Sequence, residues 1–250
     1  MKKTGNTILI TGGGSGIGKA LAEAFHRAGN QVIIAGRREA PLKAVADANP
    51  GMAYRLLDIA DGASIPAFAG ELVSSFPDLD AVLNNAGIMV PEAISEAPAY
   101  LATAEETIAI NLLGPIRLTA ALLPHLMTKK NATVLTVSSG LAFVPLSLTP
   151  TYSATKAAIH SYSQSLRQQL KGTGVEVVEI APPYVQTELM TPEQASDPRA
   201  MPLADFVAEV MDILGRDGVE EVIVERCKPL RFAEASGKHA EMFNMLNGMH

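Results

Sequence analysis

Two residues with complementary chemistry, Tyr152 and Lys156, stand four positions apart in the segment "TYSATKAAIHSYSQSLRQQL". In a helix this spacing places both side chains on one face, within a single turn. An ammonium group beside a phenol favours the phenolate and lowers the pKa of the tyrosine toward neutral pH, as a general acid or base requires. The pair therefore predicts proton-transfer chemistry, although a Tyr-x-x-x-Lys pair on its own often arises by chance.

A hydroxyl group is expected near this pair. The apolar stretch "ATVLTVSS" (132–139) reads as a strand that ends in Ser138 and Ser139, thirteen residues before Tyr152. Ser139 can donate a hydrogen bond to the carbonyl oxygen of a substrate, whereas Ser138 is expected to cap or to pack.

A glycine-rich turn occurs near the start of the chain, in "ILITGGGSGIGKALAEAFHRAG". An apolar strand precedes it and an amphipathic helix follows it, which is the context of a dinucleotide site. Glycines let the backbone approach a pyrophosphate, whose charge then meets the N–H groups at the start of the helix. The candidates for cofactor binding are Gly12, Ser15, Gly16, Ile17 and Gly18, and the alternative is a structural turn without a ligand.

The next strand ends in "VIIAGRRE" (32–39), where dinucleotide-binding folds often carry a carboxylate for the ribose 2′-hydroxyl. Arg37 and Arg38 stand there instead, and a guanidinium suits a 2′-phosphate. We therefore expect NADP(H) to be favoured over NAD(H). Alternatively, the arginines are solvated charges that open the next helix, and this alternative applies more to Arg38 than to Arg37.

Strands alternate with helices along the whole chain. The expected strands are 7–11, 31–35, 53–58, 80–85, 132–139, 175–181 and 220–225, and the expected helices include 17–29, 39–48, 62–76, 101–129 and 153–170. This alternation predicts βαβ units and a seven-stranded parallel sheet with helices on both faces, in an α/β doubly wound arrangement. In helix 153–170, one apolar face is expected to carry Ala154, Ala158, Tyr162, Leu166 and Leu170, and another face carries Tyr152 and Lys156.

Composition narrows the class of function. The 250 residues carry a net charge of −6 with scattered basic residues, so we expect a small-molecule substrate and neither nucleic acid nor membrane as partner. Cys227 is the single cysteine, which excludes a disulfide and a cysteine zinc site; it is expected to pack, and no metal is expected. The short apolar run at the N-terminus and the lack of a membrane-span segment predict a cytoplasmic protein.

Several motifs together resemble the compact, single-domain form of the short-chain dehydrogenase/reductase family over nearly the whole chain. They are "TGGGSGIG", "NNAG" (84–87), Asn111 in "INLLGPIRLT", Ser139 and "YSATK". The resemblance implies a Rossmann-type, three-layer α/β/α fold and NAD(P)-dependent oxidoreduction. It also implies a catalytic set made of Asn111, Ser139, Tyr152 and Lys156.

The resemblance also gives each of these residues a role. Tyr152 would exchange a proton with the substrate oxygen, Ser139 would stabilise that oxygen, and Lys156 would tune Tyr152 and bind the nicotinamide ribose. Asn111 would hold a kinked helix and a water molecule.

Further cofactor contacts are implied by the same resemblance. They are Asp58 and Ile59 at the adenine, Asn85, Ala86 and Gly87 along the ribose, and Val185 and Thr187 at the carboxamide. Asp58 can instead be a helix-capping residue. Pro183 in "APPYVQTEL" departs from the family pattern, which has glycine there, and fixes φ without a backbone donor.

Within the family, the chain resembles the DltE-like oxidoreductases in four segments, namely "VIIAGRRE", "TVSSGLAF", "APPYVQTEL" and "VERCKPLRFAE". This label establishes no substrate.

We expect one domain over 1–250, with 183–202 as a substrate lid or a plain surface loop, and with a tail at 228–250. Met242, Phe243 and Leu246 in the tail have helical spacing and predict a docking helix. Surplus apolar residues on helices 101–129 and 153–170 and the family resemblance predict a homodimer or homotetramer.

The expected function is interconversion of a carbonyl and an alcohol by hydride transfer. Apolar residues expected at the substrate side suggest an uncharged, moderately hydrophobic substrate, or else merely pack the lid; they are Met89, Phe143, Val144, Leu146 and Met190. Two alternatives stay open: a non-catalytic NADP-binding redox sensor, and an isomerase or dehydratase with tightly held NAD. The intact Asn, Ser, Tyr and Lys set disfavours the first, and the arginines and short chain disfavour the second.

Overall fold

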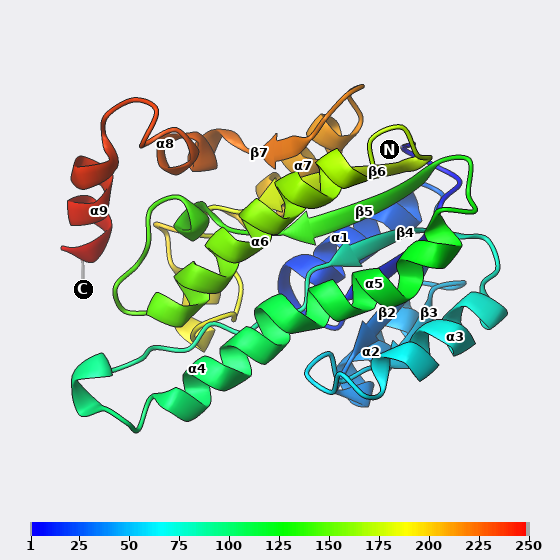
Figure 1. Cartoon of the computed structure of the whole chain (residues 1–250), viewed down its shortest axis with the longest axis horizontal. Helices are drawn as coiled ribbons and strands as arrows, with labels where there is room; N and C mark the ends of the chain where they lie inside the picture. The colour runs from blue at the N-terminus through cyan, green and yellow to red at the C-terminus, as the bar shows by residue number, and fades with distance from the viewer. Residues whose placement is uncertain (1, 249–250) are drawn as a thin grey trace.

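A computed structural model describes residues 2–248, and in this range the chain builds one seven-stranded parallel sheet (Figure 1). The strand order is β3-β2-β1-β4-β5-β6-β7, so the direction of winding reverses between β1 and β4. The strands are β1 (Thr7–Thr11), β2 (Gln31–Gly36), β3 (Ala53–Leu56), β4 (Leu79–Asn84), β5 (Ala132–Val137), β6 (Val175–Ala181) and β7 (Glu221–Ile223). The prediction of a doubly wound α/β fold is confirmed.

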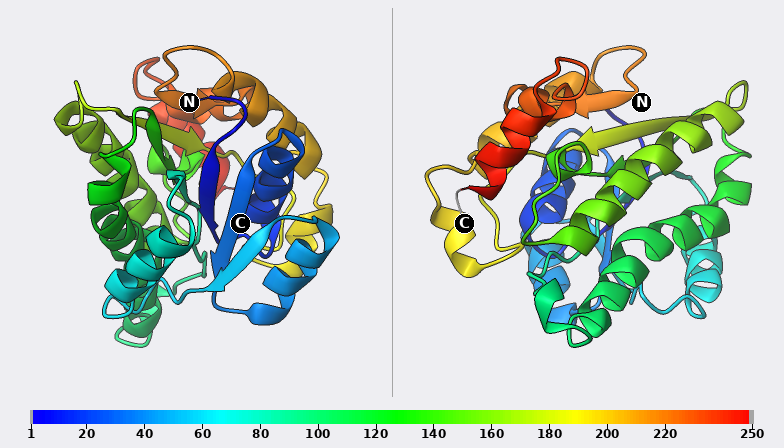
Figure 2. Two further views of the ribbon diagram at one scale, coloured as in Figure 1. Left: turned by 90° about the vertical axis from the view of Figure 1, so that its right-hand side faces the viewer. Right: turned by 60° about the vertical axis from the view of Figure 1, so that its left-hand side comes forward.

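Helices cover both faces of the sheet (Figure 2). On one face lie α1 (Gly16–Arg27), α2 (Glu39–Ala48) and α7 (Leu203–Leu214); on the other lie α3 (Ile65–Ser75), α4 (Leu101–Ile108), α5 (Gly114–Leu126) and α6 (Pro150–Gln169). The chain ends in the short helix α8 (Lys228–Arg231) and in α9 (His239–Asn247). The tail helix predicted from Met242, Phe243 and Leu246 is therefore present as α9. Position 1 of the predicted domain and positions 249 and 250 of the predicted tail lie outside the described residues.

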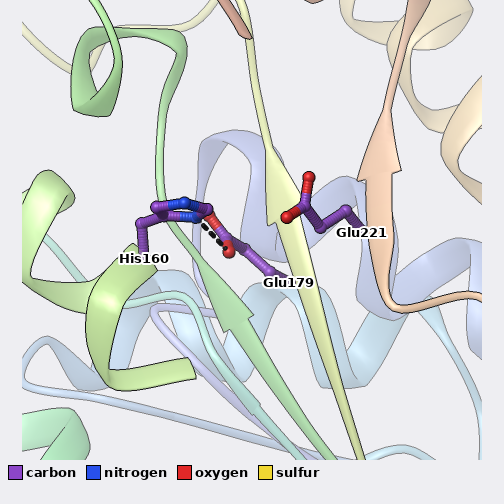
Figure 3. Close-up of side chains that lie close together, drawn as sticks. All are labelled: His160, Glu179 and Glu221. Carbon is purple, nitrogen blue, oxygen red and sulfur yellow. Dashed lines mark hydrogen bonds and ion pairs between the residues drawn. The ribbon is translucent and has the colours of Figure 1, made fainter. Parts of the chain in front are cut away.

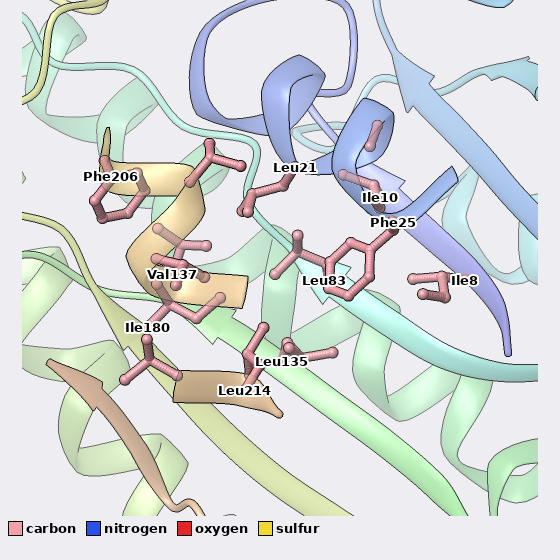
Figure 4. Packing of buried hydrophobic residues seen from close by; sticks show 14 of the residues in the cluster. Ile8, Ile10, Leu21, Phe25, Leu83, Leu135, Val137, Ile180, Phe206 and Leu214 are labelled. Atoms are coloured by element: carbon pink, nitrogen blue, oxygen red, sulfur yellow. The ribbon is translucent and has the colours of Figure 1, made fainter. Parts of the chain in front are cut away.

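Two apolar clusters fix the helices to the sheet. In the first cluster, Leu21 and Phe25 of α1 and Phe206 of α7 pack on strand residues such as Ile10 and Ile180 (Figure 4). All of these side chains are almost completely buried. Because the inner strands β1, β2, β4, β5 and β6 are buried on both faces, they read in the sequence as nearly continuous apolar runs rather than as alternating patterns.

The long helical stretch predicted at 101–129 is interrupted. Between α4 and α5, residues Ala109–Leu113 form one π-helical turn, with Asn111 at its centre. By length and composition alone, the continuous stretch Leu101–Leu126 is long and apolar enough to cross a membrane, whereas the sequence predicted no segment of that kind. This stretch packs against α3, α6 and the sheet, and core helices of soluble proteins can be equally long and apolar.

Two other features differ from the expectations. The predicted apolar face of α6 is buried only toward the end of the helix, at Leu166 and Leu170. In the first turns Ala154 is exposed and Ala158 partly so, whereas Tyr152 and Lys156 are buried. The α6 face that meets the sheet therefore carries the polar pair.

The second feature is α7, a helix that was not predicted, although "LADFVAEVMDIL" has apolar residues at helical spacing.

Candidate active site

A cavity of about 930 Å³ opens at the carboxyl ends of the strands, beside the reversal point of the sheet. This is where open α/β sheets bind ligands. Nearly all of the predicted site residues line it: Gly12, Ser15, Gly16, Ile17, Gly18, Arg37, Arg38, Ile59, Asn85, Ala86, Gly87, Ser139, Tyr152, Lys156, Val185 and Thr187. Asp58 and Asn111 are not among the residues that line it.

The glycine-rich turn requires glycine for two physical reasons. Gly12 has φ of +68°, a left-handed conformation that side-chain-bearing residues rarely adopt. A Cβ atom on Gly18 would lie 2.3 Å from the carbonyl oxygen of Gly12, so the start of α1 packs directly against the end of β1. Ser15 forms no side-chain cap, which leaves the first N–H groups of α1 facing the cavity for an anionic group.

Thr11, at the end of β1, holds the loop that follows β4. Its hydroxyl accepts hydrogen bonds from the backbone N–H groups of Asn85 (3.0 Å) and Ala86 (3.1 Å). The Asn85 amide in turn donates to the carbonyl oxygen of Thr11 at 2.9 Å. The sequence reading missed Thr11, which belongs to the strand and carries no motif of its own.

Arg37 and Arg38 follow the end of β2 and line the cavity. The guanidinium of Arg37 lies 3.7 Å from a carboxylate oxygen of Glu106 on α4, and both side chains are about half exposed (50% and 54%). A long ion pair between exposed side chains contributes little. Arg37 is therefore held only loosely, and its fork remains available to an anion in the cavity.

Asp58 does not join the other predicted cofactor residues. Its carboxylate accepts a hydrogen bond from the backbone N–H of Ala60 at 3.0 Å, and its neighbours Leu57 and Ile59 line the cavity instead. This contact closes a local turn and is not a helix cap, because the next helix, α3, begins only at Ile65; the alternative interpretation of Asp58 as a helix-capping residue is therefore not met either.

The first turn of α6 brings Tyr152 to the cavity wall. Glu92 anchors this turn, because one carboxylate oxygen accepts from the backbone N–H (3.1 Å) and the hydroxyl (2.8 Å) of Thr151. Burial raises the pKa of Tyr152 to about 12, against the opposing effect of its hydrogen bond with Ser139. The expectation of a lowered tyrosine pKa is therefore wrong for this structure, in which Tyr152 keeps its proton near neutral pH.

Lys156 is turned partly away from the phenol. Its ammonium group donates to the carbonyl oxygen of Val137 at 2.8 Å and lies 5.5 Å from the centre of the Tyr152 ring. Burial lowers the pKa of Lys156 to about 8, and the carboxylate of Glu179 acts in the opposite direction. The charge of this lysine is thus poised within the range of working pH.

The two serines at the end of β5 have different partners. Ser139 lines the cavity, and its hydroxyl oxygen accepts from the N–H of Leu141 at 3.1 Å. Ser138 donates a hydrogen bond to the buried carboxylate of Glu179 on β6. Ser138 thus packs inside the fold as expected, but as part of a polar cluster that the sequence reading did not identify.

Asn111 lies behind the cavity wall, in the π-helical turn. Its side-chain oxygen accepts from the N–H of Ile88 at 2.9 Å, and its amide donates to the carbonyl oxygen of Ile88 at 2.9 Å. A longer contact of 3.4 Å joins it to the hydroxyl of Thr155 on α6. Asn111 therefore ties the irregular helix to the strand-end loop and to the helix that carries Tyr152.

The segment 183–202 is folded against the cavity rather than loose. Gln194 donates to the carbonyl oxygen of Val185 (2.8 Å) and to the hydroxyl of Thr187 (3.2 Å), and Val185 forms a parallel bridge with Met201. Pro183 also lines the cavity, so the segment keeps a route along the site in spite of the proline.

The far end of the cavity is mainly apolar. Met89, Leu146 and Met190 line it as expected, whereas Phe143 and Val144 do not: Val144 is fully buried, and Phe143 packs on His160 with ring centres 4.8 Å apart. The sequence reading missed other contributors, namely Leu141, Tyr184, Leu189, Leu203, Leu230 and Leu246. Leu246 lies on α9, so this wall depends on how the tail folds back.

Comparisons with known proteins agree with this geometry. The family model described as short chain dehydrogenase matches residues 6–198. The uncharacterized oxidoreductase DltE of Bacillus subtilis (strain 168) is 38% identical over 250 residues, which cover 99% of this chain and 98% of that protein.

Solved structures show the same fold. A short-chain dehydrogenase from Streptomyces avermitilis superposes with a TM-score of 0.84 at 24% identity, over 97% of this chain and 96% of that one. A short chain dehydrogenase from Burkholderia cenocepacia J2315, solved in complex with NADP, gives a TM-score of 0.84 at 24% identity, over 98% and 99% of the two chains.

Proposed function

The chain belongs to the short-chain dehydrogenase/reductase family, whose members are oxidoreductases, and on that premise we propose that it interconverts a carbonyl and an alcohol with NADP(H). The observation that carries the proposal is that one cavity contains the glycine-rich turn, Arg37, Ser139, Tyr152 and Lys156. The hydride would be supplied by the nicotinamide of the bound cofactor.

Tyr152 is proposed as the general acid of carbonyl reduction. Its buried phenol holds a proton at neutral pH and lies in hydrogen-bond contact with Ser139. A carbonyl oxygen that binds to both hydroxyl groups would be polarised by Ser139 and protonated by Tyr152. In the reverse direction, Tyr152 would accept the proton of the alcohol.

Lys156 and Asn111 would support this proton transfer. A cationic Lys156 lowers the free energy of the developing phenolate, and its ammonium lies on the cavity wall where a ribose hydroxyl can be bound. Asn111 would act by holding the backbone at Ile88 and the helix beside Thr155 in place.

The proposed preference for NADP(H) rests on Arg37, with Arg38 as its neighbour at the same edge. The end of β2 offers a guanidinium whose partner, Glu106, is 3.7 Å away, and a 2′-phosphate would form a shorter and stronger pair. The uncapped start of α1 would bind the pyrophosphate, and Ile59, Asn85, Ala86, Gly87, Val185 and Thr187 would line the remaining length of the cofactor.

The proposed substrate is a small, uncharged and moderately hydrophobic molecule. Arg199, a cation on the cavity wall, is already engaged by Asp197 through its Nε (3.1 Å) and Nη2 (2.7 Å) atoms. Because this pair neutralises the guanidinium, the apolar end of the cavity offers little attraction to a carboxylate. We propose that 183–202 forms the lid over this end.

We also propose a homodimer or homotetramer, formed through the outer faces of α4 to α6. Leu101, Ile108 and Leu113 are 46%, 38% and 37% exposed on the α4 and α5 stretch, which is consistent with a further partner of the same chain. The cytoplasmic location and the single-domain organisation of the chain stay predictions.

The test is a panel of carbonyl and alcohol compounds followed at the nicotinamide absorbance, with NADPH and NADH compared side by side. We expect net NADPH oxidation with one group of apolar carbonyls and slower reaction with NADH. Binding of NADPH without turnover of any compound would favour the sensor, and product formation without net cofactor consumption would favour an isomerase.

A further inference from the structure

Glu179 is a fully buried carboxylate on β6, the strand between β5 and the edge strand β7. Both of its oxygen atoms have partners: Ser138 donates to one, and the Nδ1 atom of His160 lies 2.8 Å from the other. Figure 3 shows the His160 ring of α6 against this carboxylate, while Glu221 extends toward them from β7. A charged group without access to water is costly to bury, so its presence at this position requires a reason.

A metal ion does not supply that reason. The potential ligand atoms of His160, Glu179 and Glu221 lie within 4.8 Å of one another. However, Arg231 donates to both oxygens of Glu221, from Nε at 2.7 Å and from Nη2 at 3.1 Å. Both oxygens of Glu221 are thus already engaged by this guanidinium, and the Ser138 hydroxyl occupies one oxygen of Glu179.

The cluster lies directly beneath the proposed active site. Ser138 precedes Ser139 in the chain, and His160 follows Lys156 by one turn on the buried face of α6. Lys156 donates to the carbonyl oxygen of Val137, the last residue of β5 and the residue before Ser138. Glu179 is therefore connected to the proton-transfer residues in two ways: through Ser138, which precedes Ser139, and through His160, which lies one turn after Lys156 on α6.

We propose that Glu179 is a positioning residue for the reaction: its buried carboxylate keeps Lys156 cationic and, through Ser138, fixes the end of β5 that carries Ser139. This inference rests on the proposed function of the cavity. Burial alone lowers the pKa of Lys156, and Glu179 is the group that opposes this effect.

The charges that face Glu179 from the surrounding elements leave its field available to Lys156. From β7 and α8, Glu221 and Arg231 form a two-pronged pair whose charges offset each other. Cys227 contributes no charge, because burial raises the pKa of its thiol to about 12. From α6, His160 contacts Glu179 through Nδ1 at 2.8 Å, and on the same helix the carboxylate favours the protonated form of Lys156.

The test compares two substitutions by the pH dependence of kcat/KM for carbonyl reduction. Glu179→Gln removes the charge but keeps the shape, since an amide can still accept from Ser138 and pair with the His160 ring. Glu179→Asp keeps the charge but shortens the side chain. Folding of each variant is checked by circular dichroism and by NADPH fluorescence titration. If Glu179→Gln does not fold, Glu179→Met replaces it as the uncharged variant of similar size.

We expect Glu179→Gln to move the midpoint of the basic limb to lower pH by about one unit, because the Lys156 and Tyr152 pair loses its proton more readily without the nearby anion. Glu179→Asp should lower activity yet keep that midpoint close to the wild-type value. Glu220→Gln, at an exposed position nearby, is the surface control and should leave the profile unchanged.

The inference is overturned if Glu179→Gln, or Glu179→Met in its place, lowers kcat/KM equally at every pH, since that result indicates a structural role alone. It is also overturned if Glu179→Asp shifts the midpoint as far as the neutral variant does. If instead the wild-type enzyme reduces no carbonyl compound, the proposed function fails. The inference can then still be tested by ultraviolet difference titration of the Tyr152 phenol, with Tyr152→Phe as the reference. This titration reports whether Glu179→Gln lowers the pKa of the Lys156 and Tyr152 pair.

Discussion

Replacement of Arg37 by alanine should weaken NADPH selectively. A guanidinium that bonds a 2′-phosphate contributes about 1.5 to 3 kcal/mol. To form this bond, Arg37 must give up its contact with Glu106, which at 3.7 Å and half exposure is worth about 0 to 1 kcal/mol. The net loss of about 0.5 to 3 kcal/mol corresponds to about a 2- to 150-fold rise in the Kd of NADPH.

The assay is a fluorescence titration of each variant with NADPH and with NADH at fixed ionic strength. NADH has no 2′-phosphate, so its Kd should not change in Arg37→Ala. Arg55→Ala, on β3 and away from the cavity lining, is the matched arginine control and should change neither affinity. Glu106→Gln frees Arg37 and should leave NADPH binding unchanged or somewhat tighter. Equal weakening of both cofactors in Arg37→Ala, or an unaltered NADPH preference, would refute the reasoning.

Three further predictions concern other parts of the cavity. Gly18→Ala should abolish or strongly weaken cofactor binding and destabilise the fold by about 1 to 3 kcal/mol, because the new Cβ would meet the Gly12 carbonyl oxygen at 2.3 Å; native-like NADPH affinity in titration would contradict this. Lys156→Met should abolish turnover and raise the free energy of unfolding at pH 7 by about 1 to 2 kcal/mol. In the fold the pKa of Lys156 is about 8, below the ordinary 10.5, so at pH values below 8 the charged lysine opposes folding, and methionine removes that cost. A lower urea midpoint than that of the wild type would count against this prediction. Asn247→Ala should raise KM for apolar substrates several-fold and leave the Kd of NADPH unchanged. The reason is that the Asn247 side chain accepts from the N–H of Ser147 (2.6 Å) and so holds α9 beside the apolar end of the cavity. An unchanged KM in steady-state kinetics would contradict this prediction.

The elements of the fold could be predicted from the sequence because local patterns determine them. The strands at 7–11 and 175–181 and the helix at 39–48 have the predicted bounds, since each is an apolar run or amphipathic stretch bounded by turn residues. The glycine-rich turn and the Tyr152 and Lys156 pair likewise depend on spacing within one segment.

Contacts between distant segments could not be predicted in this way. The buried face of the first turns of α6 was misassigned because Tyr152 and Lys156 are buried there, and small residues such as Ala154 do not distinguish an outer face from an inner one. The raised pKa of Tyr152 depends on burial that the sequence does not reveal. Glu179 lies in an apolar strand, and its meaning emerges only once Ser138 and His160 are seen beside it.

The central claim is that Tyr152 transfers the proton in an NADPH-dependent reduction. The most direct measurement compares Tyr152→Phe with the wild type on the best carbonyl substrate, by turnover at the nicotinamide absorbance and by NADPH titration of the same samples. Loss of the phenol hydroxyl should abolish turnover and leave the Kd of NADPH within about two-fold, because the ring and its packing remain. Turnover by Tyr152→Phe close to the wild-type rate would contradict the account.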